Sequence, residues 1–157
     1  MKAIAFALAI TVSPAIAAEP IIGRATVTDG DTIEIHGQRI RLFGIDAPEG
    51  GQTCGDEAGR QYRCGQTAAL ALDRLIASAS PTRCEPLDVD RYGRIVARCF
   101  TGAVDVAEWL VSRGLAVDYP EYSRGVYGPA ENRARTAKAG LWRGRFEKPW
   151  EWRRASR

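Results

Sequence analysis

The chain has 157 residues, enough for one domain with a hydrophobic core but too few for two. Its 45% hydrophobic and 26% charged residues are ordinary for a globular protein, which excludes disordered and fibrous classes. Of its 22 basic and 19 acidic residues, six basic and two acidic ones lie from Leu141 onward. Without these and Lys2, 15 basic residues face 17 acidic ones, so phosphate binding must come from a few placed arginines.

The first 18 residues have the features of a secretory signal peptide. Lys2 supplies a positive start, residues 3–12 are almost wholly apolar, and Ala15-Ile16-Ala17 resembles a cleavage triplet. The apolar run is too short to span a bilayer; the alternative is a buried N-terminal helix. We therefore expect a removed leader (1–18), one domain (19–142) and a basic, solvated tail (143–157). The mature protein is expected to be periplasmic or secreted, without a membrane span.

The expected elements begin with three strands, because an alternation of β-branched residues is broken at the turn signals Asp29-Gly30 and His36-Gly37. A polar, glycine-rich loop follows, and then apolar residues recur at helical spacing until Pro81. Two further strands form a hairpin. The expected bounds are 21–28, 31–36 and 38–43 for the strands, 44–62 for the loop, 66–79 for the helix, and 82–89 and 93–100 for the hairpin.

The second half of the chain contains two more helix signals. Asp105 with Glu108 three residues later is typical of a capping box, and Gly114 ends that helix. Pro129 opens a third helix, which runs to Gly140. Five short strands and about three helices, without a βαβ alternation, indicate a β-rich α+β fold built on a small closed or partly closed barrel.

Four cysteines bear on both the fold and the compartment. With no CxxC pair and one histidine in the chain, they argue against a zinc site. In an oxidising compartment an even count suggests disulfides, with three possible connectivities. We favour Cys84–Cys99, which lie symmetrically about a hairpin turn, and Cys54–Cys64, which would close a polar loop. Four free thiols are the alternative.

Two acid-bearing turns carry the candidate chemistry. The first is Asp29-Gly30-Asp31-Thr32, and the second is Gly44-Ile45-Asp46-Ala47-Pro48-Glu49, directly after the third strand. An Asp-Gly pair alone is usually a structural hairpin signal, but turn chemistry does not require Asp31. If the third strand lies near the first turn, Asp31 and Asp46 can converge. Two carboxylates without His or Cys nearby are oxygen ligands for a hard cation, Ca²⁺ or Mg²⁺.

Two arginines make this chemistry more specific. Arg41 precedes the second acidic turn, and Arg94 follows the turn Asp90-Arg91-Tyr92-Gly93. A phosphodiester that passes through a five-coordinate state spreads negative charge over its equatorial oxygens, and planar guanidinium groups bind such oxygens in pairs. Either arginine taken singly could instead be an exposed residue that pairs with a neighbouring acid.

Three blocks of the sequence together resemble the staphylococcal nuclease family. They are Val27-Thr28-Asp29-Gly30-Asp31-Thr32-Ile33, Arg41-Leu42-Phe43-Gly44-Ile45-Asp46-Ala47-Pro48-Glu49 and Asp90-Arg91-Tyr92-Gly93-Arg94, in the family's order and with similar spacing. Gly114-Leu115-Ala116 and Gly140-Leu141-Trp142 resemble its later landmarks. The resemblance covers about residues 21–142. It implies a five-stranded OB-fold barrel with three helices, and a monomeric Ca²⁺-dependent nuclease that hydrolyses DNA and RNA to 3′-phosphates.

The resemblance also implies roles for individual residues. The side chains of Asp31 and Asp46 and the main-chain carbonyl of Ala47 would hold Ca²⁺. The family often has Thr where this chain has Ala47, a change that a main-chain ligand should tolerate. The catalytic residues implied are Arg41 and Arg94, which would bind the scissile phosphate, and Glu49, which would position or activate the attacking water.

Aromatic residues are the candidates for stacking on bases. Tyr92 fits its block of the family pattern directly, whereas Tyr122 fits only with a small shift; packing at the barrel edge is the alternative for both. The loop with Cys54 and Cys64 departs from the family's best-known member. Two other protein classes compete with the enzyme: a catalytically silent OB-fold module that binds nucleic acid, and a disulfide-stapled structural or inhibitor module. A silent relative would usually have lost one or more of the polar residues that the resemblance implies. All five are present in this chain, which favours the enzyme: Asp31, Arg41, Asp46, Glu49 and Arg94.

Overall fold

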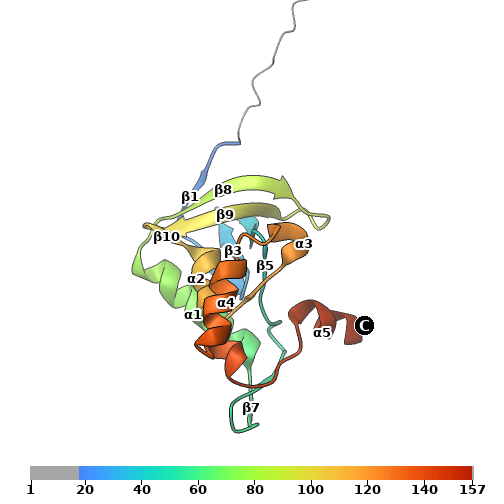
Figure 1. The fold of residues 1–157 in the computed structure, drawn as a ribbon. Coiled ribbons are helices and arrows are strands. Elements are labelled where there is room, and N and C mark those ends of the chain that lie inside the picture. The colour runs from blue at the N-terminus through green and yellow to red at the C-terminus, as the bar shows by residue number, and fades with distance from the viewer. Residues whose placement is uncertain (1–17, 157) are drawn as a thin grey trace, which may run out of the picture.

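The computed structural model describes residues 18–156, so most of the expected signal peptide lies outside the described residues. Seven strands form one mixed sheet: β1 (Ile21–Gly23), β2 (Thr26–Asp29), β3 (Thr32–Ile35), β4 (Gln38–Leu42), β8 (Thr82–Val89), β9 (Ile95–Thr101) and β10 (Val104–Asp105). Their order is β1-β8-β9-β4-β3-β2, with β10 beside β9 (Figure 1). The β4–β9 pair is parallel and the other pairs are antiparallel.

The sheet curls without closing into the expected five-stranded barrel. β1 and β2 stand at opposite ends of the strand order, yet only Arg24 and Ala25 separate them in the chain. Three Cα-to-Cα steps, from Gly23 to Thr26, reach at most about 11 Å, so the two ends of the sheet must approach each other. Among the described residues no ladder joins these two strands, and the predicted single strand over 21–28 is in fact divided between the two edges.

Two small sheets lie outside the main one, and three of their four strands fall in the stretch predicted as loop. β5 (Ile45–Asp46) pairs with β11 (Val117–Asp118), and β6 (Cys54–Gly55) pairs with β7 (Gln61–Tyr62). Because β5 pairs with β11, the second acidic turn is held by a segment about seventy residues further along the chain.

Over residues 18–156, five α-helices and one 3₁₀ helix complete the β-rich α+β fold. They are α1 (Cys64–Ser78), α2 (Val106–Ser112), α3 (Pro120–Ser123), α4 (Gly128–Thr136), the 3₁₀ helix η1 (Gly140–Arg143) and α5 (Pro149–Ala155). The three expected helices correspond to α1, α2 and α4, and the Asp105 side chain caps α2 by accepting a hydrogen bond from the backbone N–H of Glu108 (3.1 Å). Within residues 18–156, no helix has the length and apolar character required to cross a bilayer.

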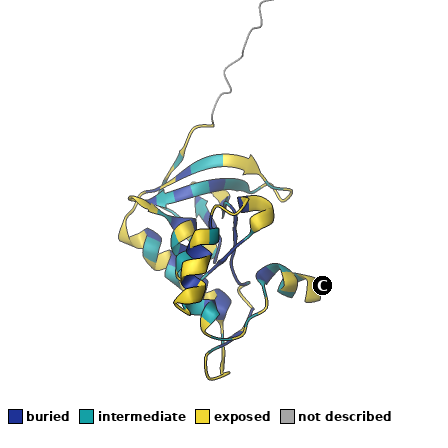
Figure 2. Ribbon diagram, in the orientation of Figure 1, coloured by how far each residue is buried: buried dark blue, intermediate teal, exposed yellow. Residues whose placement is uncertain are grey.

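The main core lies between the curled sheet and helices α1, α2 and α4, where Figure 2 shows the inner faces as buried. Ile33 and Ile35 on β3 are completely buried and the residue between them, Glu34, is only partly buried, as expected for a strand that turns one face to the core. A second, smaller cluster joins the 54–64 loop to the C-terminal segment; its members are Cys54, Cys64, Val117 and Leu141, with Tyr62, Trp142, Phe146 and Trp150 packed against them.

The turn between β3 and β4 holds the only histidine of the chain. His36 and Gly37 both have positive φ angles (53° and 76°), which matches the two-residue hairpin turn expected from the sequence. The Nε2 atom of the His36 ring lies 3.0 Å from the carbonyl oxygen of Ile22. The turn therefore also contacts the edge strand β1.

Both favoured disulfides, Cys54–Cys64 and Cys84–Cys99, are present. Cys84 and Cys99 are paired neighbours on β8 and β9, and both are fully buried. We expect the double variant Cys84→Ala/Cys99→Ala to lose about 3 kcal/mol of unfolding free energy, because a cross-link over a loop of this length restricts the unfolded chain. Urea unfolding checks this, and a variant as stable as the oxidised wild type would contradict it.

Candidate functional site

The first acidic turn is fixed against β4. The β2–β3 pairing has an irregularity between Val27 and Asp29, directly before the turn. The Asp29 carboxylate accepts a hydrogen bond from the backbone N–H of Asp31 (3.1 Å), and the backbone N–H of Leu42 donates to the carbonyl of Asp31 (2.8 Å). These bonds hold Asp31 at the end of the hairpin, where its carboxylate is buried.

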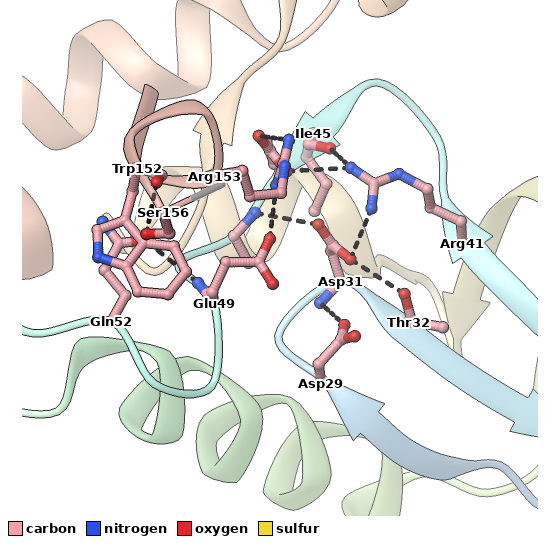
Figure 3. Close-up of polar contacts among 12 residues, drawn as sticks. Asp29, Asp31, Thr32, Arg41, Ile45, Glu49, Gln52, Trp152, Arg153 and Ser156 are labelled. Atoms are coloured by element: carbon pink, nitrogen blue, oxygen red, sulfur yellow. Dashed lines mark hydrogen bonds and ion pairs between the residues drawn. The ribbon is translucent and has the colours of Figure 1, made fainter. Parts of the chain in front are cut away.

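Arg41 bridges the two acidic turns. It pairs in register with Thr32 on the neighbouring strand, which places its side chain beside Asp31. Its Nη1 donates to Oδ1 of Asp31 (3.1 Å) and its Nη2 donates to Oδ1 of Asp46 (3.0 Å). Figure 3 shows the Arg41 side chain pointing toward Asp31. The structure thus brings Asp31, Asp46 and Arg41 together, as the sequence predicted.

A direct contact also joins the two turns. The backbone N–H of Ala47 donates to Oδ2 of Asp31 (3.1 Å). A Cβ atom at Gly30 would lie 2.8 Å from the Cβ of Ala47 and 3.1 Å from that of Ala68 on α1. Glycine at position 30 therefore lets the first turn pack closely against both the second turn and the helix.

Arg153 of α5 is the site residue that the sequence interpretation missed. Its Nη1 and Nη2 bind the two carboxylate oxygens of Asp46 (3.0 and 2.8 Å), and Nη1 also donates to Oε1 of Glu49 (2.6 Å). Figure 3 shows this guanidinium group entering from the side opposite Arg41. The expected solvated tail is thus wrong for this segment, which forms a helix docked on the acidic turns. In the sequence, Pro149 is typical of the first turn of a helix and indicates where α5 begins.

The acids and arginines perturb one another. Burial and then the charge of Asp31 raise the pKa of Asp29 to about 6. Burial also raises the pKa of Asp46, even though Arg153 and Arg41 act in the opposite direction. Burial alone would lower the pKa of Arg41, but the charges of Asp31 and Asp46 outweigh it and the pKa is raised.

The cluster has an excess of negative charge. Four carboxylates (Asp29, Asp31, Asp46 and Glu49) are held with two guanidinium groups (Arg41 and Arg153), so the formal charge is −2 when all are ionised. Burial is the main cause of the raised pKa values of Asp29 and Asp46, and the negative charge of Asp31 adds to it in both cases.

Arg94 makes no hydrogen bond or ion pair with the acids of the cluster among the described residues. The β4–β9 register pairs Arg41 with Val96, and Arg94 lies two residues before Val96, directly ahead of the first residue of β9. Its guanidinium group is bound to Asp90 instead, with Nε and Nη2 both 2.7 Å from Oδ2. Burial alone would raise the pKa of Asp90, but the hydrogen bonds from Arg94 outweigh it and the pKa is lowered.

The two tyrosines predicted to stack on bases both lie on the surface. Tyr92 is 65% exposed, and Arg94 lies over its ring at 5.5 Å. Tyr122 is 58% exposed and meets Tyr119 edge-on, with ring centroids 4.7 Å apart. The ring of Tyr119 is also covered by Trp150 of α5, which stacks on it with ring centroids 4.6 Å apart and an interplanar angle of 14°. Both tyrosines therefore lie on the surface and outside the core, and their stacking on bases stays a prediction.

The fold and the site described above can now be set beside the comparison of the sequence with protein families. Residues 39–144 match the family model described as staphylococcal nuclease homologue, so the chain belongs to that family. The chain is 50% identical over 132 residues to the succinoglycan biosynthesis protein ExoI of Rhizobium meliloti (strain 1021), an alignment that covers 83% of this chain and 69% of that protein.

Other relatives carry names that describe an activity. An uncharacterized endonuclease of Escherichia coli is 33% identical over 134 residues, with 81% of this chain and 80% of that protein covered. A probable staphylococcal-like nuclease of Oryza sativa subsp. japonica is 35% identical over 130 residues, covering 82% of this chain but only 36% of the plant protein. The chain thus spans about a third of that plant relative's length.

Proposed function

We propose that the protein is a calcium-dependent nuclease that hydrolyses phosphodiester bonds of DNA and RNA and leaves 3′-phosphates. The observation that carries this proposal is the contact of Arg41 with both Asp31 and Asp46, which joins a phosphate-binding group to two candidate cation ligands. Membership of the staphylococcal nuclease homologue family supports it, as do relatives named nuclease and endonuclease.

The donor set fits a hard cation. In the part of the chain that the structure describes, no three His, Cys, Asp or Glu side chains surround one metal position. A cation would therefore be held by Asp31, Asp46 and the main-chain carbonyl of Ala47, with water and substrate as further oxygen ligands. The formal charge of −2 and the raised pKa of Asp46 are conditions that a divalent cation would relieve.

When bound, the cation would polarise a phosphate oxygen and lower the pKa of a bound water. The chain's own groups supply the rest. Arg41 binds a non-bridging phosphate oxygen, and Arg94 joins it once it exchanges Asp90 for the substrate. Glu49 accepts a proton from the attacking water, whose oxygen forms the new bond to phosphorus. The bond to the 5′ oxygen breaks and that oxygen takes a proton from solvent to leave as a hydroxyl, so the phosphate stays on the 3′ oxygen.

Digestion of single-stranded and plasmid DNA and of RNA by the purified protein tests this proposal. We expect cleavage in Ca²⁺ and none in a chelator, because the two acids without the cation would repel the phosphate. Products should require a phosphatase before a polymerase can extend their 3′ ends. Intact nucleic acid in both conditions, together with a retained gel shift, would instead indicate a catalytically silent binding module.

The two disulfides are typical of proteins from an oxidising compartment. We therefore place the proposed activity outside the cytoplasm, in the periplasm or the medium. Intact mass measurement of protein from its native host tests this: the expected species lacks about the first 18 residues and has two disulfides. A full-length chain with four alkylatable thiols would contradict it.

A further inference from the structure

Helix α5, which contacts the second acidic turn, lies outside the part of the chain that matches the family. That match ends at residue 144, whereas Arg153 is nine residues further on. Its guanidinium group forms a two-bond fork on Asp46 and shares one nitrogen with Glu49. Burial alone would lower the pKa of Arg153, but its hydrogen bonds to Asp46 and Glu49 outweigh it and the pKa is raised, so the group stays charged.

We infer that Arg153 is a positioning residue for hydrolysis: it fixes the carboxylate of Glu49 relative to Asp46. The inference rests on the proposed function. Among the described residues, Arg153 is the hydrogen-bond partner that the structure gives the Glu49 carboxylate. The Glu49 side chain is 35% exposed, so without Arg153 it would be free to exchange rotamers. A residue that accepts a proton from water needs a fixed position within hydrogen-bond reach of that water.

Helix α5 is docked firmly enough for this task. Trp150, three residues before Arg153, stacks on Tyr119 and belongs to the second hydrophobic cluster. Upstream, the carbonyl of Arg145 accepts a hydrogen bond from the backbone N–H of Gly55 (2.7 Å). The guanidinium group is therefore presented by a packed helix and not by a mobile chain end.

Buried Gln52 provides a second link between the Glu49 loop and the tail. Its side-chain oxygen accepts a hydrogen bond from the backbone N–H of Glu49 (3.2 Å), and its side-chain nitrogen donates to the carbonyl of Glu147 (2.7 Å). The side chain is completely buried, so neither bond competes with water. The backbone of Glu49 and its carboxylate are thus both tied to the C-terminal segment.

The charge balance indicates that Arg153 acts beside a cation and not in its place. With Arg153 bound, the cluster retains the formal charge of −2 described above, which a divalent cation can neutralise. Carboxylates that bind metals are commonly oriented by further hydrogen bonds, and loss of such a partner costs about 10–100-fold in activity or affinity.

The test compares Arg153→Gln and Arg153→Lys with Arg154→Gln, a matched change at the exposed neighbour on the same helix. We expect Arg153→Gln to lower kcat on a single-stranded oligonucleotide about 10–100-fold. KM should change less than about threefold, because the lost contact is not to the substrate. Rates should be compared at saturating Ca²⁺, because Arg153 also contacts Asp46, a proposed cation ligand. Arg153→Lys keeps the charge but not the fork, so its kcat should be intermediate. Arg154→Gln should match the wild type.

Three results would overturn the inference. One is an unchanged kcat in Arg153→Gln. Another is tighter Ca²⁺ binding with higher activity at low Ca²⁺, which would make Arg153 a competitor of the cation. The third is a loss of melting temperature, equal in the Gln and Lys variants, that accounts for the lost rate. An inactive wild type defeats the proposed function, whereas an active wild type matched by Arg153→Gln defeats only this inference.

Discussion

Replacing Arg41 by alanine is expected to slow phosphodiester hydrolysis by about 100–1000-fold, the usual cost of removing one preorganised donor from a developing negative charge. Arg41 is the guanidinium group that already contacts both acidic turns, and its side chain is only 19% exposed. Steady-state kinetics on an oligonucleotide at saturating Ca²⁺ would measure the loss.

The same variant should also report on the cluster's charge. Without Arg41, Asp31 keeps only neutral hydrogen-bond partners, so the melting temperature in chelator should fall and Ca²⁺ should restore much of it. Arg39→Ala is the matched control, because Arg39 lies on the same strand but is exposed. Equal activity of Arg41→Ala and Arg39→Ala would remove Arg41 from the proposed mechanism.

Gly65→Ala should inactivate the protein although Gly65 carries no functional group. A Cβ atom there would lie 1.8 Å from the carbonyl oxygen of Glu49 and 2.5 Å from its carbonyl carbon. Because these are backbone atoms, the Glu49 loop and α1 must move apart, and overpacking of this kind costs about 1–3 kcal/mol. A displacement of about 1 Å at a reacting group can cost about 100-fold in rate.

A matched control lies in the same loop. Gly51→Ala adds the same methyl group where nothing lies within 4 Å, so it should leave both rate and stability unchanged. Rates should be measured well below the melting temperature, so that the effect of Gly65→Ala reports loop position and not unfolding. Full activity of Gly65→Ala would show that the rate tolerates movement of Glu49.

The parts of the site that were predictable are those that local sequence determines. Alternating Ile33 and Ile35, followed by a His-Gly turn, fix the β3–β4 hairpin, and the hairpin register then places Arg41 beside Asp31. The cysteine pairs were predictable for the same reason, since Cys84 and Cys99 flank one turn symmetrically. Short-range pattern and turn chemistry are sufficient for such contacts.

The docking of the C-terminal segment was not predictable: Pro149 marks the start of α5, but no local pattern encodes the surface that the helix meets. A helix of seven residues is not stable on its own, so α5 depends on the surface that it meets. That surface, at Tyr119 and Asp46, is distant in the chain: Arg153 and Asp46 are 107 residues apart. The open edges of the sheet were missed for a similar reason, since the division of residues 21–29 between β1 and β2 depends on which partner strands lie nearby.

The lone histidine gives the molecule a built-in spectroscopic reference. Because His36 is the only imidazole in the sequence and its ring contacts Ile22 of β1, its ring Hε1 proton should give one resolved NMR signal that reports on the attachment of the edge strand. β1 and α5 lie well apart in Figure 1. A sample in which α5 detaches should therefore keep this signal in place, whereas global loosening of the sheet should shift it.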